Sequence, residues 1–234
     1  MLLSCRIWCK MNVQFFRWLF LAVLATIIVI GNLVSPITLG ASAEWSNGTY
    51  LFAGGTNPWA IALAVVVIFL YLLLMYSPPM QQASPFPGVF RRFVAFWLDF
   101  VLAMIAVGPI VGILPTLTEW RRTGVFEWNF ERTTHAAGDG WLIAIVTATS
   151  FVVLIIYYAF PLIRRRPSPG ACIAGYQIIA DDGVVLSPRT AVLRTLLGFL
   201  ATSAWFIAPF IARDRKQGKF WLDKVFDTRA VKVK

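Results

Sequence analysis

Apolar residues occur in long unbroken runs along this chain, and shorter polar segments separate the runs. A helix that spans a membrane needs about 20 predominantly apolar residues. Four runs are of this kind, and we expect each of them to form a spanning helix. They cover residues 18–35, 59–76, 93–115 and 141–163. The pattern therefore predicts an all-α polytopic membrane protein with four transmembrane helices.

A fifth apolar stretch, residues 195–212, differs from the others because it is short and contains residues that interrupt a spanning helix. The interruptions are Gly198, Thr202, Ser203 and Pro209. We expect a re-entrant or interfacial helical segment here, in which the non-helical break is shielded by protein. A short fifth spanning helix is the alternative.

Two other segments have the composition of strands and predict a small β-sheet. Residues 176–187 indicate a hairpin whose turn is Asp181-Asp182-Gly183. A two-stranded hairpin is marginally stable alone, and the alternating residues 228–233 supply a third strand. This pairing requires the C-terminal tail and the hairpin to lie on the same side of the membrane.

The composition strengthens the membrane assignment. Hydrophobic residues make up 59% of the 234 residues and charged residues only 14%, whereas a soluble domain is roughly half apolar and about a quarter charged. These values exclude a soluble enzyme, a disordered chain and a disulfide-framed secreted module. The chain is also too short to hold a large water-soluble catalytic domain beside the predicted helices.

The net charge of +10 indicates orientation in the membrane rather than nucleic-acid binding, because Lys and Arg are retained on the cytoplasmic side. With both termini and the β-sheet in the cytoplasm, eighteen of the Lys and Arg residues lie inside and three outside. We therefore expect a multi-pass protein of the inner (cell) membrane with cytoplasmic termini. Ala41-Ser42-Ala43 also resembles a signal-cleavage site, but the preceding apolar run is longer than usual for a signal, which favours a retained helix.

Charged residues within the predicted third helix are the main candidates for chemistry. Arg92 and Asp99 are seven residues apart, so they share one helix face with a rise of roughly 10 Å between them. An ionised carboxylate at a helix centre costs about 2.5–3.5 kcal/mol on insertion scales. Asp99 must therefore be protonated, paired or facing a polar cavity. It is either an ion or proton site, or a structural anchor to a cationic neighbour.

Three segments resemble parts of the RDD family of membrane proteins, which is named for one arginine and two aspartates. Residues 91–99, Arg-Arg-Phe-Val-Ala-Phe-Trp-Leu-Asp, resemble the family's opening, with Arg92 and Asp99 at the first two motif positions. Residues 168–194 are similar to its middle section. Residues 221–231 resemble its closing segment, with Asp223 at the second aspartate. The resemblance implies an RDD-like membrane domain with a β module over residues 86–234, preceded by an N-terminal pair of helices in residues 1–85.

The chain departs from the family pattern at three positions. Leu222 stands where histidine is usual, Asp227 where glycine is usual, and Ala171 where a basic residue is common. What the resemblance implies about function is transport of ligands that are not established, including cation/proton exchange for some members. We also expect Asp223 to emerge near the cytoplasmic end of the third helix, where it can bridge Arg92.

The remaining charged cluster, Arg164-Arg165-Arg166, follows the fourth predicted helix directly. It is expected to anchor the end of that helix and to contact anionic lipids. The chain has a single histidine and shows no phosphate loop, nucleophile motif or metal-ligand spacing. We therefore expect no enzymatic activity, no catalytic residues, no bound metal and no cofactor.

Two functions fit these observations. The first is transport of ions or small solutes, with Asp99 as the proton carrier in a proton-coupled version. The second is a non-catalytic accessory or assembly subunit of a larger membrane complex. One intramembrane carboxylate is too little to line a water-filled pathway in a monomer, so we expect a homo-oligomer or other membrane proteins as partners, together with lipids and without nucleic acid.

Overall fold

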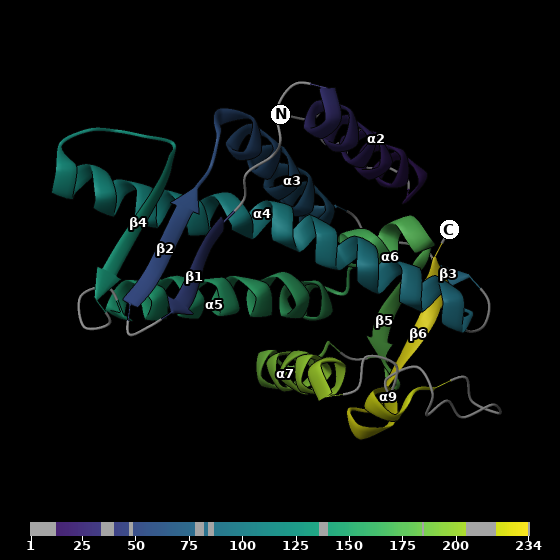
Figure 1. Ribbon diagram of the computed structural model, residues 1–234. Coiled ribbons are helices and arrows are strands. Elements are labelled where there is room, and N and C mark those ends of the chain that lie inside the picture. The colour runs from purple at the N-terminus through teal and green to yellow at the C-terminus, as the bar shows by residue number, and fades with distance from the viewer. Residues whose placement is uncertain are drawn as a thin grey trace, which may run out of the picture. The chain divides into compact units, whose positions relative to one another are not determined.

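The computed structural model describes residues 13–33, 40–46, 49–77, 82–83, 87–135, 140–183, 185–204 and 219–233. The chain divides into two compact units, and the division runs through the long helices. The first unit comprises Met1–Ala22, Leu70–Leu102 and Ile155–Lys234, and the second comprises Val23–Phe69 and Ala103–Leu154. The protein is mostly helical, with a small antiparallel sheet in each unit (Figure 1).

Three helices are long and apolar enough to cross a membrane: α3 (Pro58–Tyr76), α4 (Val89–Thr123) and α5 (Gly140–Arg164). They confirm the helices predicted at 59–76, 93–115 and 141–163, and α4 continues for eight residues past its predicted end. Helix α2 (Val13–Leu33) covers most of the first predicted run. Its described apolar part, Gln14–Thr26, is shorter than a membrane span.

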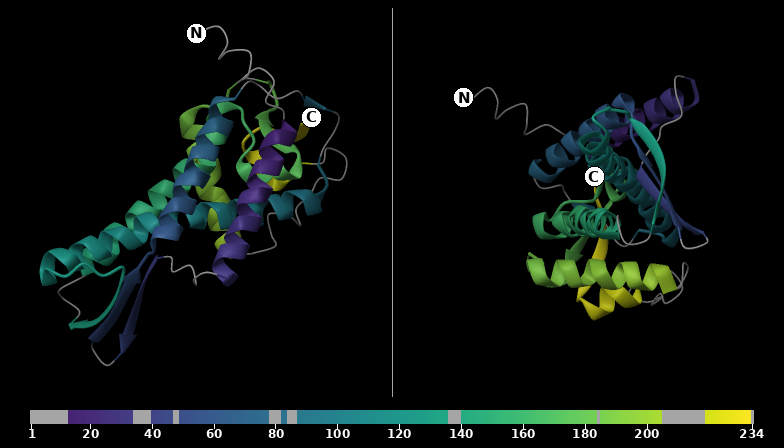
Figure 2. Two further views of the ribbon diagram at one scale, coloured as in Figure 1. Left: turned by 90° about the horizontal axis from the view of Figure 1, so that it is seen from above. Right: turned by 60° about the vertical axis from the view of Figure 1, so that its left-hand side comes forward.

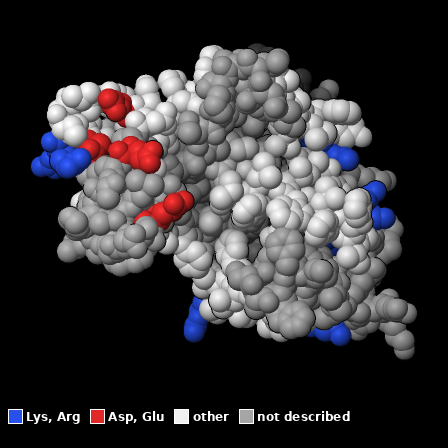
Figure 3. Space-filling view, in the orientation of Figure 1, with Lys and Arg blue, Asp and Glu red and all other residues white. Residues whose placement is uncertain are grey.

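The second unit contains a sheet that the sequence pattern did not predict. Strands β1 (Gly40–Ser46), β2 (Thr49–Gly55) and β4 (Asn129–His135) pair antiparallel in the order β1-β2-β4 (Figure 2). The tripeptide Ala41-Ser42-Ala43 lies within β1, opposite residues 52–54 of β2. This sheet joins the segment between α2 and α3 to the segment between α4 and α5. Acidic and basic side chains gather at the end of the unit that carries the sheet (Figure 3).

The first unit contains the sheet that the sequence predicted in part. Strand β6 (Thr228–Val233) has the predicted bounds and lies at the centre of the order β3-β6-β5. It pairs antiparallel with β5 (Tyr176–Ala180) and with the two-residue β3 (Gln82–Ala83). Tyr176 lies opposite Lys232 in this register.

The prediction of a β-hairpin over residues 176–187 is wrong in its second strand. Residues 185–187 are not a strand, and Val184 lies outside the described residues. Leu186 is buried instead against Ala159 and Leu162 of α5. The Ser187 hydroxyl accepts a hydrogen bond from the Thr190 amide at the start of α7 (Pro188–Ala204). Leu186 therefore packs against α5 and Ser187 caps α7, so neither residue forms the second strand of a hairpin.

The pairing of β5 with β6 bears on the side of the membrane on which the C-terminal tail lies relative to β5. Backbone ladder bonds do not form between segments on opposite sides of a bilayer, so residues 228–233 lie on the same side as residues 176–180. That this side is the cytoplasm stays a prediction from the charge distribution. The predicted re-entrant segment begins in α7, and its continuation over 205–212 lies outside the described residues.

Candidate functional site

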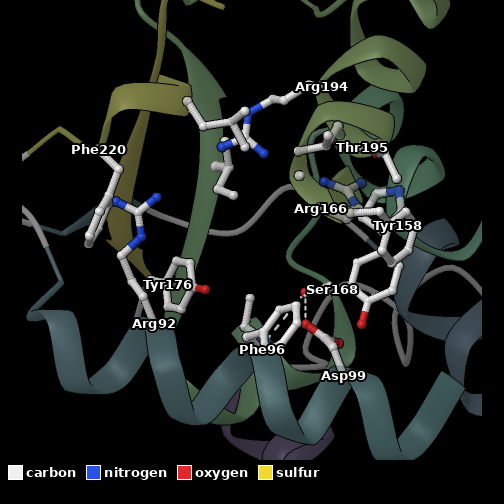
Figure 4. A pocket seen from close by; sticks show the side chains of 17 residues that line it. Arg92, Phe96, Asp99, Tyr158, Arg166, Ser168, Tyr176, Arg194, Thr195 and Phe220 are labelled. Carbon is white, nitrogen blue, oxygen red and sulfur yellow. Dashed lines mark hydrogen bonds between the residues drawn. The ribbon is translucent and has the colours of Figure 1, made fainter. Parts of the chain in front are cut away.

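A buried carboxylate in the first unit lies between two arginine side chains. Arg92 Nη2 donates to Asp223 Oδ2 at 2.8 Å, and Arg194 Nη2 donates to Asp223 Oδ1 at 2.7 Å. The side chain of Asp223 is 0% exposed. The Arg92 guanidinium also lies over the ring of Phe220, 3.9 Å from its centroid (Figure 4). This network joins α4, α7 and α9 (Trp221–Val225).

Local sequence places Asp223 at the centre of that network. It is the third residue of α9, where a carboxylate is favoured by the helix dipole, and its Oδ2 accepts the Phe220 amide at 3.2 Å. The turn from α9 into β6 brings Thr228 back, so that its hydroxyl accepts from Arg194 Nε at 3.3 Å. Asp227 in this turn has φ of 45°. Aspartate is one of the few non-glycine residues that adopt this left-handed conformation readily, so the departure from the family's glycine is tolerated.

The charges of this network are set by burial and by the ion pairs. Burial raises the pKa of the Asp223 carboxyl, but the charges of Arg92 and Arg194 outweigh it and hold that pKa below its ordinary value. Burial lowers the pKa of Arg194, and the Asp223 charge offsets part of this effect. With one ionised carboxylate between two guanidinium groups, the network carries one positive charge in excess.

The second buried carboxyl of this region, that of Asp99, lies in a different environment. Asp99 Oδ1 accepts the Gly170 amide at 2.7 Å and the Tyr157 hydroxyl at 3.2 Å, and Oδ2 accepts the Ser168 hydroxyl at 2.5 Å. The residue is 4% exposed. Within the described part of the chain, every hydrogen-bond donor to this carboxyl is neutral. The structure thus joins Arg92 to Asp223, and it joins Asp99 to α5 and to the start of α6 (Pro169–Ala174) rather than to a cation.

Each residue of the segment Ser168-Pro169-Gly170 favours the contact between the start of α6 and Asp99. Ser168 is the N-cap of α6, and proline occupies the first helical turn, where its missing N–H is not needed. Gly170 lies directly against α4, because a Cβ at this position would be 2.2 Å from the Ala95 carbonyl oxygen and 2.8 Å from Asp99 Cγ. This close approach lets the Gly170 amide reach the carboxyl.

A cavity of about 180 Å³ lies between these two networks (Figure 4), and we call it the arginine cavity. Its lining combines charged or hydroxyl side chains with a larger number of apolar ones. The polar lining residues are Arg92, Asp99, Tyr158, Arg166, Ser168, Tyr176, Arg194 and Thr195. Polar groups from α4, α5 and α7 therefore converge on one cavity.

The three consecutive arginines at the end of α5, Arg164, Arg165 and Arg166, have different environments. Only Arg166 lines the arginine cavity, and it also donates to the Ser77 carbonyl oxygen. Burial, and then the neighbouring charge of Arg164, lower the pKa of Arg166. Arg164 lies over the rings of Tyr76 and Phe160, and Arg165 donates to the Gly183 carbonyl. Arg164 and Arg165 are exposed, as contact with lipid headgroups would require.

Sequence reasoning missed the roles of Tyr157, Tyr158 and Arg194. The signal for the tyrosines was two adjacent hydroxyl-bearing residues inside an otherwise apolar run, because buried tyrosine hydroxyls usually find a partner. The signal for Arg194 was a single charge at the border of an apolar stretch. In the described ranges, no group of three or more His, Cys, Asp or Glu side chains is placed to hold a metal ion.

The comparison with protein families bears on all of these residues. The model of the RDD family matches residues 86–226, which is more than half of the chain. The chain belongs to the RDD family. No curated protein and no solved structure gives a significant match. In this RDD protein the described residues that line the arginine cavity all lie within the match, and two departures from the family pattern, Leu222 and Ala171, are among them. Together with the three apolar helices, the match identifies a membrane protein.

Proposed function

We propose that this RDD protein transports a small charged solute across the membrane, binds it in the arginine cavity, and couples its movement to protonation of Asp99. One observation carries the proposal. The Asp99 carboxyl is buried in a membrane-spanning helix, lines a cavity that also contains three guanidinium groups, and accepts hydrogen bonds from neutral donors. Buried ionisable residues in spanning helices mark ion and proton pathways more often than not.

The hydrogen bonds of Asp99 suit a group that gains and loses a proton. When the carboxyl is ionised, it accepts from Ser168, Gly170 and Tyr157. When Oδ2 carries a proton, the Ser168 hydroxyl can accept from it, because a hydroxyl both donates and accepts. The Gly170 and Tyr157 bonds to Oδ1 stay in place. The same arrangement of the chain therefore satisfies the hydrogen bonds of both the ionised and the protonated carboxyl.

The surrounding tyrosines hold this carboxyl in a fixed position. The rings of Tyr71 and Tyr157 stack with centroids 5.0 Å apart, and the Tyr71 hydroxyl donates to the Tyr157 carbonyl at 2.9 Å. Tyr157 is thus anchored to α3 while its own hydroxyl reaches Asp99. Because these hydrogen-bond donors hold the carboxyl in place, it can gain or lose a proton without changing its position.

Substitution of Asp99 by asparagine tests the proposal. Asparagine keeps the size and an acceptor oxygen but takes up no proton, so we expect at least about a tenfold loss of pH-gradient-driven flux with little change in folded yield. The full chain is reconstituted in vesicles containing a pH-sensitive dye, and sodium, potassium and phosphate are offered in turn. Asp227→Asn, the same chemical change at an exposed position, is the control and should behave like the unsubstituted protein.

Two results would overturn parts of this proposal. Wild-type flux in the Asp99→Asn variant would remove the proton role of Asp99. Absence of flux above empty vesicles for every ion, from folded protein, would remove transport and favour the role of accessory subunit in a larger membrane complex.

A further inference from the structure

We propose that the arginine cavity binds a phosphate or carboxylate anion, held chiefly by Arg92, Arg166 and the Tyr158 hydroxyl. This inference deepens the proposed function, because it gives the chemical class of the ligand for the same cavity. It stands on the charge of the cavity walls, on donors that have no partner among the described residues, and on the apolar lining.

The charge of the cavity walls favours an anion. Three guanidinium groups, those of Arg92, Arg166 and Arg194, line the cavity. Asp223 neutralises one of the two arginines that it contacts. Asp99 is the remaining carboxyl, and its hydrogen bonds go to neutral donors. An anion that enters this space meets positive charge in excess, and a cation would have to displace an existing ion pair.

Several donors of the cavity have no partner among the described residues. They are Arg92 Nη1, Arg166 Nε and the Tyr158 hydroxyl. The Arg92 side chain is only 9% exposed, and Figure 4 shows it at one side of the cavity with Arg166 and Tyr158 at the other. Buried donors are nearly always hydrogen-bonded in folded proteins. Oxygens of phosphate or carboxylate are the acceptors that guanidinium groups bind most strongly.

The apolar lining indicates where the anion comes from. Much of the wall consists of hydrophobic side chains: Phe96, Leu162, Ile178, Phe199, Phe220 and Leu222. A fully hydrated ion gains nothing from such a surface, whereas an acyl chain or another apolar body does. The lining therefore favours an amphiphile with a phosphate head, such as an anionic membrane lipid, over free inorganic phosphate.

Three matched probes separate these sources when added to the purified full chain in an uncharged detergent. Dioctanoyl phosphatidic acid carries both head and apolar body, dioctanoylglycerol carries only the body, and inorganic phosphate carries only the anion. Bound ligand is measured by native mass spectrometry and by the rise in unfolding temperature that binding produces. We expect phosphatidic acid to bind roughly tenfold or more tightly than dioctanoylglycerol, since a charge-assisted hydrogen bond contributes about that factor.

Two substitutions locate the bound anion. Arg166→Gln should weaken phosphatidic acid binding roughly tenfold, and Tyr158→Phe roughly threefold, in line with a charged and a neutral hydrogen bond. Tyr158→Phe removes only a hydroxyl that has no partner among the described residues, so its unfolding temperature without lipid should stay unchanged. Arg189→Gln, at an exposed position of α7 outside the cavity, is the charge-matched control and should bind as the unsubstituted protein does.

Equal binding of phosphatidic acid and dioctanoylglycerol, or equal losses in Arg189→Gln and Arg166→Gln, would overturn the anion site. Inorganic phosphate that binds as tightly as phosphatidic acid supports the anion site and assigns it to a free solute. The outcome is independent of the flux test. Anion binding without flux would overturn transport of the offered ions and support the anion site, and flux without anion binding would overturn this inference alone.

Discussion

Asp223→Ala is expected to lower the free energy of unfolding by about 3–5 kcal/mol, the range found when one partner of a buried ion pair is removed. The carboxylate is fully buried and holds both Arg92 and Arg194. Its loss leaves two guanidinium groups without a counter-ion in a region where charge is poorly solvated. The loss also removes the carboxylate oxygen that accepts the Phe220 amide at the start of α9. We therefore expect a sharp fall in folded yield after extraction in mild detergent.

A double-mutant cycle tests whether the contact itself is responsible. Arg92→Ala should destabilise the protein less than Asp223→Ala, because Asp223 then keeps Arg194 as its partner. The double variant should lose less than the sum of the two single losses, since both changes remove the same contact. Folded yield and thermal unfolding of the four proteins are the measurements.

Asp182→Ala serves as the control for the cycle, because this aspartate is exposed in the turn after β5. Surface substitutions of this kind usually change stability by less than about 0.5 kcal/mol. Strictly additive losses for Arg92→Ala and Asp223→Ala would contradict the ion pair. A stable Asp223→Ala variant with wild-type yield would show that the carboxylate is not needed to balance the arginines.

Gly170→Ala is expected to be the second most damaging substitution, with a cost at the upper end of the 1–3 kcal/mol that is typical of overpacking, or roughly 3 kcal/mol. The added Cβ would lie 2.2 Å from the Ala95 carbonyl oxygen. That atom belongs to the backbone of α4 and cannot turn aside as a flexible side chain can. The new methyl group would also lie 2.8 Å from Asp99 Cγ, so α6 must move away from α4.

The matched control is Gly88→Ala, which makes the same chemical change directly before α4. A Cβ at Gly88 would meet no atom within 4 Å, so this variant should unfold at nearly the same temperature as the unsubstituted protein. Thermal unfolding of both variants in the same detergent separates the steric effect from any general effect of alanine. If the two variants unfold at the same temperature, the close contact between α6 and α4 is not present in solution.

The family's three motif residues serve two separate networks. Arg92 and Asp99 share one face of α4, and their spacing alone would be consistent with both side chains belonging to one network. Arg92 instead bonds to Asp223, which is 131 residues away along the chain. Asp99 bonds to the start of α6 and to Tyr157. The ion pairs hold the tail to α4, and the neutral hydrogen bonds leave the Asp99 carboxyl able to change its protonation state.

The long helices, the C-terminal strand and the family could be predicted from the amino-acid sequence alone. Apolar runs of spanning length need only local composition, because the thickness of the bilayer sets their length. Strand β6 was equally visible, because alternation along residues 228–233 matches the two faces of a half-buried strand. The sequence also predicted an Arg92–Asp223 contact, but only through the resemblance to the family and the assumption that the tail returns to the same side.

Strand pairing and the hydrogen-bond donors of each carboxyl could not be predicted in this way, because they depend on tertiary contacts. The β1-β2-β4 sheet joins residues more than 70 positions apart, and the Gly, Ala and Ser content of β1 gave no alternating apolar signal. The predicted second strand of the hairpin does not form, because Leu186 packs against α5 and Ser187 caps α7. Arg194 became the second partner of Asp223 because α7 folds back against α9. Each of these outcomes depends on contacts between distant segments, whose free energy is not encoded in local pattern.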